Sequence, residues 1–263
     1  MISITMLNNG DRKNKIKTAL QNTAALLLAI AVWQIAAMSV GEEILLASPL
    51  KVLARFFALL GEGSFWDALS FTFVKITAGF FFGFTAGVLL AVIAGRFRIA
   101  EILLRPFLIT VKTVPVASFI VISLIWLSSK KLSVFISFLM VLPIIYTNVL
   151  EGLKSTDKKL LEAATVYKMP WGKRFKYIYL PALRPHVISA ATLSLGLAWK
   201  SGIAAEIIGI PDGSVGEMFY YAKAYLNTID LFAWTLTVVA VSVVFEKLIT
   251  AGIKLFYKQL FKA

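Results

Sequence analysis

The stretch DKKLLEAATVYKMPWGKRFKYIYLP, from Asp157 to Pro181, is a basic polar segment between long apolar runs. Asp157 can cap the start of a helix, and the chain offers no helix breaker before Met169-Pro170. Trp171 to Ile178 can form one or two further helical turns before Leu180-Pro181 closes the segment. The sequence therefore predicts a helix, a break and a second helix, in the part of the chain best suited to contact a soluble partner.

The rest of the chain has the composition of a membrane protein. Its 263 residues are 59% hydrophobic, with a mean hydropathy of +0.82, whereas soluble domains are roughly 45–50% apolar. A soluble core of this size cannot bury so much apolar surface, so we expect an all-α membrane protein whose solvent is lipid. Cysteine is absent and histidine occurs only as His186, which excludes disulfides and a thiolate or histidine-rich metal site.

Six transmembrane helices are expected within a membrane domain of residues 24–256. Their approximate bounds are 24–40, 73–94, 113–128, 132–150, 187–210 and 231–253. A basic tail (1–23) precedes them, a short tail (257–263) follows, and the basic segment (154–181) lies between the fourth and the fifth. The first apolar run also resembles a signal peptide, but it exceeds the roughly 7–15 residues of such a segment, which favours a retained span.

Two further patterns predict helices with particular contacts. Pro49 is expected to start an interfacial helix, because apolar residues recur after it at helical spacing. Gly79, Gly83 and Gly87 repeat every four residues in the second span, which predicts the close approach of another helix on that face.

Positive charge is distributed unevenly over the predicted loops. A net charge of +13 could suggest nucleic-acid binding, but the basic residues cluster beside the apolar spans. The outer loops hold five Lys and Arg residues: Lys51, Arg55, Lys130, Lys131 and Lys223. The inner loops and tails hold nineteen: Arg12, Lys13, Lys15, Lys17, Arg96, Arg98, Arg105, Lys112, Lys154, Lys158, Lys159, Lys168, Lys173, Arg174, Lys176, Arg184, Lys254, Lys258 and Lys262. By the positive-inside rule, both termini and the basic segment are expected in the cytoplasm.

The basic segment also resembles a known motif. Glu162-Ala163-Ala164, followed at this spacing by Phe175, Ile178, Leu180 and Pro181, is similar to the EAA loop of the inner-membrane permease subunits of ABC importers. This resemblance implies a cytoplasmic coupling helix that inserts into a groove on a separate ATPase subunit. The residues it assigns to ATPase coupling are Glu162, Ala163, Ala164, Lys168, Phe175, Leu180 and Pro181. The family usually has glycine where this chain has Lys168, so we expect Met169-Pro170 to supply the bend. The alternative is a solvated basic loop that merely connects two spans.

The resemblance covers roughly residues 46–250 and implies partners and a location. It implies a homodimer of this chain, two copies of a cytoplasmic ABC ATPase and an external solute-binding protein, in a bacterial-type inner membrane. Trp199 and residues Ala205 to Gly209 are similar to the fifth span of permeases for nitrate, sulfonates and taurine. A small anion is therefore the expected solute. Family members that carry thiamine pyrimidines or riboflavin leave a vitamin precursor as the alternative.

Four residues within the spans are candidates for the translocation path or its gate: Pro115, Asn148, Lys200 and Glu206. A charge at mid-bilayer costs about 2.5–3.5 kcal/mol on insertion scales, so neither Lys200 nor Glu206 should face lipid. Lys200 either lines the path and favours anionic solutes or makes a packing contact. Glu206 is expected to order the outer end of its span or the gate, with solute contact as the alternative. Pro115 and Asn148 are equally compatible with structural roles.

Other classes of function fit the sequence less well. The chain has no Gly-x-x-x-x-Gly-Lys-Ser/Thr loop, and Ser70, Ser123 and Ser194 have no histidine partner nearby in sequence. We therefore expect no catalytic residue, no cofactor and ATP hydrolysis on a separate subunit. An ion-coupled secondary transporter that uses Glu206 and Lys200 would leave the EAA-like segment unexplained. A membrane scaffold or intramembrane enzyme is the third class, and co-purification of an ATPase would separate the first class from both others.

Overall fold

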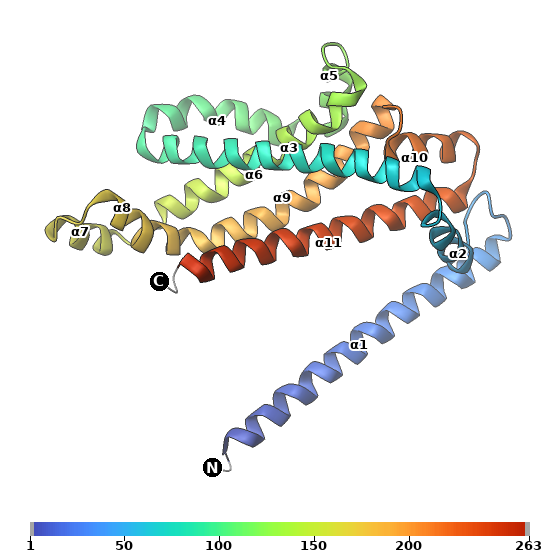
Figure 1. Cartoon of the computed structure of the whole chain (residues 1–263), viewed down its shortest axis with the longest axis horizontal. Helices are drawn as coiled ribbons and strands as arrows, with labels where there is room; N and C mark the ends of the chain where they lie inside the picture. Colours follow the sequence, from blue (N-terminus) through green and yellow to red (C-terminus); the bar gives the residue numbers. More distant parts are fainter. Residues whose placement is uncertain (1–2, 261–263) are drawn as a thin grey trace.

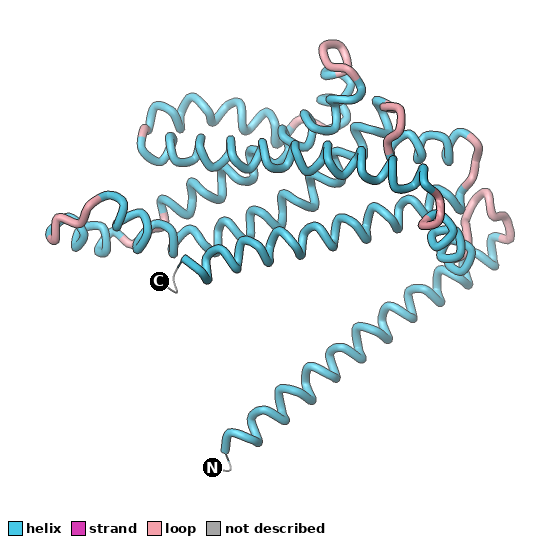
Figure 2. Tube along the Cα trace, viewed as in Figure 1, coloured by secondary structure: helices cyan, strands magenta, loops and turns pink. Residues whose placement is uncertain are grey.

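The computed structural model describes residues 3–260, with side chains from Lys17 onward except for Ala19. The side chains of Arg12, Lys13 and Lys15, and all of Lys262, therefore lie outside the described part of the predicted tails. Every regular element between residues 3 and 260 is helical (Figure 2). The elements are α1 (Ser3–Val40), α2 (Pro49–Leu59), α3 (Gly63–Arg96), α4 (Arg98–Thr113), α5 (Val116–Ser123), α6 (Ser129–Lys154), α7 (Lys158–Val166), α8 (Trp171–Arg174), η1 (Phe175–Tyr179), α9 (Leu180–Gly209), α10 (Val215–Ala224) and α11 (Thr228–Leu260).

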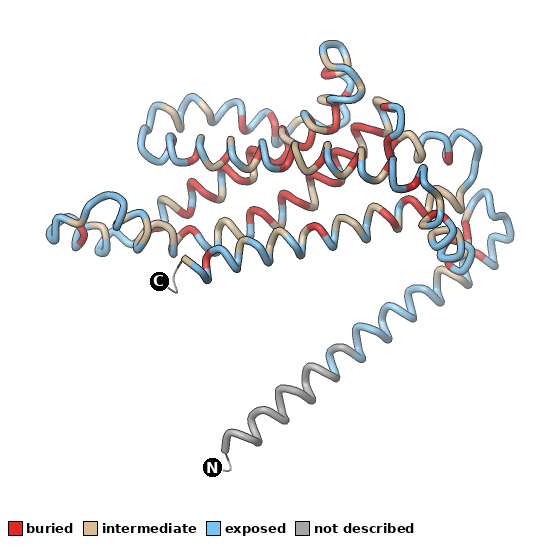
Figure 3. The backbone as a smooth tube through the Cα atoms, viewed as in Figure 1, coloured by how far each residue is buried: buried red, intermediate tan, exposed pale blue. Residues whose placement is uncertain are grey.

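Three long helices form the centre of the bundle (Figure 1). α6 packs against both α3 and α9, and α11 lies along α9. Buried residues concentrate on α3, α6 and α9 (Figure 3). The outer faces of these helices expose large apolar side chains such as Phe82 and Leu193, which is the arrangement expected of a bundle in lipid.

The glycine stripe of α3 is the contact face for α6. A Cβ atom on Gly83 would lie 2.8 Å from the carbonyl oxygen of Phe138, and one on Gly87 would lie 2.8 Å from the Cβ atom of Ile145. Gly79 meets the α6 backbone in the same way, at 2.5 Å from the carbonyl oxygen of Val134. The predicted close approach is therefore confirmed, and van der Waals packing at such contacts is what holds helices together in lipid.

Five helical segments among the described residues are long and apolar enough to cross a membrane: Leu20–Val40, Gly63–Arg96, Ser129–Lys154, Trp171–Gly209 and Thr228–Leu260. The sixth candidate is the pair α4 and α5, which is bent by 102°. This differs from the single span predicted at residues 113–128. Pro115 has no amide hydrogen, and Val114 before it takes an extended conformation, so the helix ends at that point. α5 alone is only ~12 Å long and cannot cross a bilayer.

α2 begins at Pro49 as predicted. The Ser48 side chain accepts a hydrogen bond from the Lys51 amide at 3.4 Å, and Pro49 occupies the first turn, where its missing amide hydrogen costs nothing. The helix buries Val52 and Leu59 while Leu50 and Phe57 stay exposed. One apolar face on the bundle and another on the surface are typical of an interfacial helix.

α1 stands apart from the rest of the bundle and meets it only near its C-terminal end (Figure 1). The ring of Trp33 lies 5.4 Å from that of Phe232 in α11. The segment Leu20–Val40 that could span a membrane is otherwise unburied. An apolar helix of this kind requires lipid or another membrane helix around it.

Candidate functional site

The basic segment, residues 154–181, is called the coupling loop below after the motif that it resembles, and it projects beyond the ends of α6 and α11 as a small helical unit (Figure 1). It contains α7, α8 and η1. The Asp157 carboxylate accepts a hydrogen bond from the Lys159 amide at 2.8 Å and so caps the start of α7. The structure thus has the helix, break and second helix that the sequence predicts.

Lys168 forms the turn that ends α7. Its φ of 49° lies in the left-handed region that favours glycine. The Met169 amide donates to the Ala164 carbonyl at 2.8 Å and the Lys168 amide donates to the Thr165 carbonyl at 3.0 Å, which together make a Schellman motif. The bend is therefore at Lys168, the position at which the motif that this segment resembles has glycine, and the expectation that Met169-Pro170 supplies the bend instead was wrong.

Arg174 joins the two halves of the coupling loop. Its guanidinium donates from Nε to the Met169 carbonyl at 2.8 Å and from Nη2 to the Ala164 carbonyl at 3.0 Å. Carbonyls at a helix C-terminus lack intrahelical partners and attract cations. Arg174 therefore fixes α8 against the end of α7. The sequence analysis counted it only as a positive charge, because its role depends on how the turn folds.

One part of the EAA-like motif faces away from the bundle. Glu162 and Ala163 are exposed, whereas Ala164 is buried in the turn. Large apolar side chains are exposed on the same small unit: Leu160, Val166, Tyr167 and Trp171. Tyr167 is 82% exposed and Trp171 is 71% exposed. Exposed aromatic residues on a projecting loop are typical of a surface that docks another protein.

The other part of the motif faces the bundle. Phe175 and Leu180 line an apolar cavity of about 410 Å³ with residues of α3, α6, α9 and α11. Pro181, which follows, is exposed. The coupling loop is thus attached to several membrane helices and not only to the two that it connects.

Leu180-Pro181 does not close the segment, contrary to the prediction. The helical segment runs from Trp171 to Gly209 and joins the coupling loop to the predicted fifth span. Within it, η1 is a π-helical turn in which the Leu180 amide donates to the Phe175 carbonyl. Such a wider turn relieves the clash that the Pro181 ring would make with the carbonyl four residues earlier in a regular α-helix. The second half of the loop and the fifth span therefore form one continuous element.

The four predicted path residues do not come together in one place. Lys200 is exposed on α9 and has no hydrogen bond or ion pair to any described residue. A Cβ atom on Gly196, one turn earlier, would meet open space. Asn148 donates its side-chain amide to the Ile144 carbonyl of its own helix at 2.9 Å. Pro115 is exposed at the bend between α4 and α5.

Glu206 is fully buried where α9 meets α3 and α10. Its Oε2 accepts a hydrogen bond from the Thr72 hydroxyl at 2.7 Å and from the Gly216 amide at 3.3 Å. Gly216 has to be glycine here, because a Cβ atom would lie 2.2 Å from the Cβ atom of Glu206. The carboxylate therefore contacts the start of α10, and no part of it is accessible in this structure.

All four amides at the start of α10 have partners. The Val215 amide donates to the Thr72 hydroxyl at 3.0 Å, and the Gly216 amide donates to Glu206. The Glu217 amide donates to the Ser214 hydroxyl at 3.0 Å, and the Ser214 amide to the Pro211 carbonyl at 3.2 Å. A buried helix start normally leaves these donors unsatisfied. Thr72 of α3 and Glu206 of α9 supply the hydrogen-bond acceptors that water cannot supply at this buried position. No pattern in the sequence pairs two residues so far apart.

An ion cluster fixes the same end of the bundle, opposite the coupling loop. Arg55 of α2 donates to Asp230 in the first turn of α11 and to Glu62, both at 2.5 Å. The hydrogen bond to Asp230 raises the pKa of Arg55 above its usual value. The cluster therefore attaches α2 to α11 through charge-assisted hydrogen bonds.

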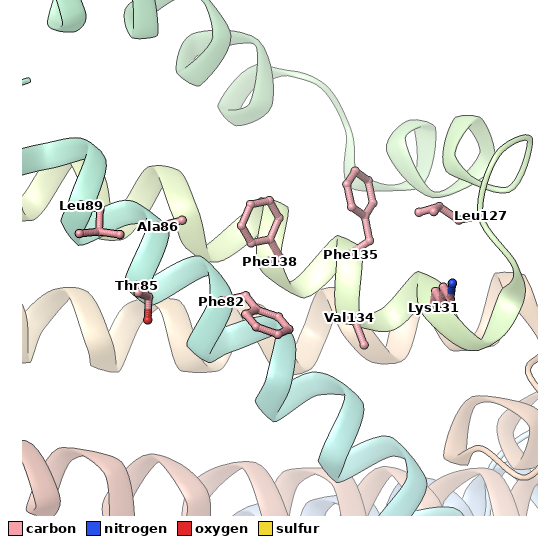
Figure 4. A pocket seen from close by; sticks show the side chains of 9 residues that line it. All are labelled: Phe82, Thr85, Ala86, Leu89, Leu127, Lys131, Val134, Phe135 and Phe138. Carbon is pink, nitrogen blue, oxygen red and sulfur yellow. The ribbon is translucent and has the colours of Figure 1, made fainter. Parts of the chain in front are cut away.

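A groove of about 590 Å³ lies between α3 and α6, and Figure 4 shows the side chains that line it. Its lining is apolar apart from Thr85 and Lys131, the latter at one end. Solute sites in proteins combine an apolar lining with several convergent polar groups. The residues around this groove lack that combination, and we do not assign a solute to it.

Comparison with known proteins shows the family to which the chain belongs. The family model described as binding-protein-dependent transport system inner membrane component matches residues 83–261, which include the coupling loop. The putative aliphatic sulfonates transport permease protein of Bacillus subtilis is 28% identical over 236 residues, covering 89% of this chain and 83% of that protein. The Escherichia coli protein of the same name is 29% identical over 202 residues, covering 76% of each chain. The formylaminopyrimidine transport permease protein of Halalkalibacterium halodurans is 26% identical over 215 residues, covering 81% of this chain and 83% of that protein. The family match extends over more than half of the chain, and the chain therefore belongs to the family of binding-protein-dependent transport system inner membrane components, the permeases of ABC importers.

Proposed function

We propose that this chain carries a small organic anion of the sulfonate type across the membrane, driven by a separate cytoplasmic ATPase. The coupling loop carries the argument. Its exposed face, around Glu162 and Trp171, offers a surface for the ATPase, and its second half continues directly into α9. A second copy of the chain and an external binding protein complete the proposed importer.

Closure of the ATPase would displace the exposed face of the coupling loop. Arg174 and the turn at Lys168 keep α7 and α8 together, so the displacement passes to α9 as a unit. Phe175 and Leu180 pass it also to the helices around their cavity. ATP supplies the difference in free energy between the two states, because a partner that contacts both states equally shifts nothing.

The substitution Glu162→Lys tests the ATPase contact. We expect it to abolish uptake and transport-coupled ATP hydrolysis, because it places a cation at the centre of the docking surface, while membrane insertion stays intact. Glu42→Lys makes the same change of charge at an exposed site at the other end of the bundle and should leave uptake normal. Normal uptake by the Glu162 variant would contradict the proposed contact.

Lys200 supports an anionic solute. It is an exposed cation on a membrane-spanning helix without a partner among the described residues, so it has to face an aqueous path or the second copy of the chain. Two of the relatives described above are named for aliphatic sulfonates. The formylaminopyrimidine permease makes a pyrimidine precursor the second candidate.

Replacement of Lys200 separates these two solute classes. Loss of one charge-assisted hydrogen bond should lower sulfonate uptake by Lys200→Ala roughly ten-fold, and Lys200→Arg should restore most of it. Uptake of radiolabelled taurine and of a formylaminopyrimidine into vesicles, each with its purified binding protein, gives the measurement. Unchanged sulfonate uptake by Lys200→Ala would remove Lys200 from the path.

A further inference from the structure

A basic pocket lies at the end of the bundle that carries the coupling loop. It has a volume of about 510 Å³ and is formed where α3 ends, α4 begins and α6 ends. Ala94 and Gly95 also line it and take up little space. The charged residues that line it are Arg96, Arg98, Glu101, Arg105 and Lys154.

The charges in this pocket are not balanced. Lys154 pairs with Glu101, with 2.5 Å between Nζ and Oε1. The three arginines have no carboxylate within ion-pair distance among the described residues, and Arg96 instead lies over the Phe97 ring at 5.9 Å. Three guanidinium groups around one pocket repel each other unless an anion lies between them.

The backbone adds to this preference for an anion. α4 starts at Arg98, and no side chain caps its first turn in the described structure. Unsatisfied amides and the helix dipole make such a start favourable for a phosphate group. Arginine side chains bind phosphate oxygens in pairs, which lysine does not do.

An apolar surface begins beside the pocket and runs along α4. Ile99, Ile102 and Leu103 are each at least 60% exposed, and Phe107 is 48% exposed. Ile102 lines the pocket itself. A small soluble anion would not contact this apolar surface. A phospholipid would, because it combines an anionic headgroup with acyl chains. Basic pockets between membrane helices at the cytoplasmic boundary bind lipids of this kind.

We propose that the pocket of Arg96, Arg98 and Arg105 binds the phosphate headgroup of an anionic phospholipid, whose acyl chains lie on the exposed face of α4. The site is separate from the coupling surface and from Lys200. It gives the protein a lipid ligand at the helix pair α4 and α5, the bent element of the bundle.

Native mass spectrometry of the detergent-solubilised full chain tests this proposal. Phosphatidylglycerol and phosphatidylcholine are added in equal amounts, and retained adducts are counted. The wild type should retain phosphatidylglycerol preferentially, and the variant Arg96→Gln, Arg98→Gln, Arg105→Gln should retain roughly ten-fold less of it with unchanged phosphatidylcholine. The charge-matched control Arg184→Gln, Lys254→Gln, Lys258→Gln removes three exposed cations at the same end outside the pocket and should behave as wild type.

A second variant is expected to raise lipid retention, a result that unfolding of the protein could not produce. Glu101→Gln frees Lys154 to act as a fourth cation, so phosphatidylglycerol retention should rise. If the pocket variant and the charge-matched control lost phosphatidylglycerol equally, retention would depend on total surface charge, and the proposed site would be overturned. Displacement of the lipid by millimolar phosphate or methanesulfonate would show a small-anion site instead and would also overturn it.

Discussion

Lys168 shows how a single residue shapes the coupling loop. A non-glycine residue in the left-handed region costs roughly 1 kcal/mol, and this chain accepts that cost at the turn where α7 ends. Two backbone hydrogen bonds of the Schellman motif and the two from Arg174 hold the turn. The turn is therefore maintained by its surroundings and not by the conformational preference of the residue in it.

We expect Lys168→Gly to stabilise this turn by about 0.5–1 kcal/mol, because glycine takes the same φ without steric cost. Hydrogen exchange at the Met169 amide, which closes the turn, should slow by roughly two- to five-fold as a result. Lys173→Gly is the matched control: it lies in helical α8, where glycine costs about 1 kcal/mol, so exchange in α8 should quicken. Faster exchange at Met169 in the Lys168 variant would contradict this account.

Single residues differ in how far the sequence reveals them. Glu162 and its neighbours form a local motif, so their place on an exposed helix can be read directly. Arg174 acts on a turn whose geometry no local pattern specifies. Thr72 and Glu206 are 134 positions apart and meet only because α3 and α9 pack together. Contacts of this kind follow from tertiary packing and not from periodicity.

At the scale of elements, α10 is the helix that depends most on its neighbours. It has ten residues and is too short to be stable alone in water. Its first turn is buried, and two of its amides are satisfied by Thr72 and Glu206. Removal of these acceptors leaves the amides unsatisfied, so the helix start should open to solvent.

Cysteine labelling can measure that opening, because the chain contains no cysteine of its own. A single cysteine at the buried Val215 should react slowly with an impermeant maleimide. In the background Glu206→Ala, Thr72→Val it should react at least roughly ten-fold faster, since two hydrogen bonds of about 1–2 kcal/mol are lost. The background Thr237→Val, which changes a buried hydroxyl on α11, should leave the rate unchanged. Equal rates in all three would show that α10 does not depend on this junction.

The helices also show which elements sequence patterns predict correctly and which they miss. The glycine stripe and the start at Pro49 are local patterns, and the helices they predict are present. The sequence predicts a basic cytoplasmic loop before residue 113, because Arg96, Arg98, Arg105 and Lys112 all lie there. The structure places a helix there, with cations at its first residue, at its middle and in its last turn, and with exposed apolar residues along it. Pro211 and Gly213 precede the short helix α10 and Gly216 lies within it, and these residues conceal the helix in the sequence.

At the scale of the whole molecule, the two ends of the bundle differ in kind. One end carries the coupling loop and the basic pocket. The other carries the Arg55 cluster, α2 and the tyrosines of α10. The positive-inside rule assigns the first end to the cytoplasm, and the proposed function requires that assignment.

Introduced cysteines test this orientation. In intact cells an impermeant maleimide should label Lys223→Cys on α10 and should not label Lys173→Cys in the coupling loop, although both positions are exposed. Lysed cells should label both. Labelling of the Lys173 variant from outside would place the coupling loop beyond the reach of any cytoplasmic ATPase and would remove the proposed function.

The π-helical turn at Phe175–Tyr179 has a geometric consequence of its own. Relative to a regular helix it accommodates one additional residue, and each residue corresponds to about 100° of rotation around the axis. The turn thus sets the rotational angle, about the helix axis, between α8 and the long helix α9 that follows it. Deletion of one residue from this turn would leave the surfaces of α8 and α9 unchanged. It would rotate α8 relative to α9, so that the coupling loop would face another direction.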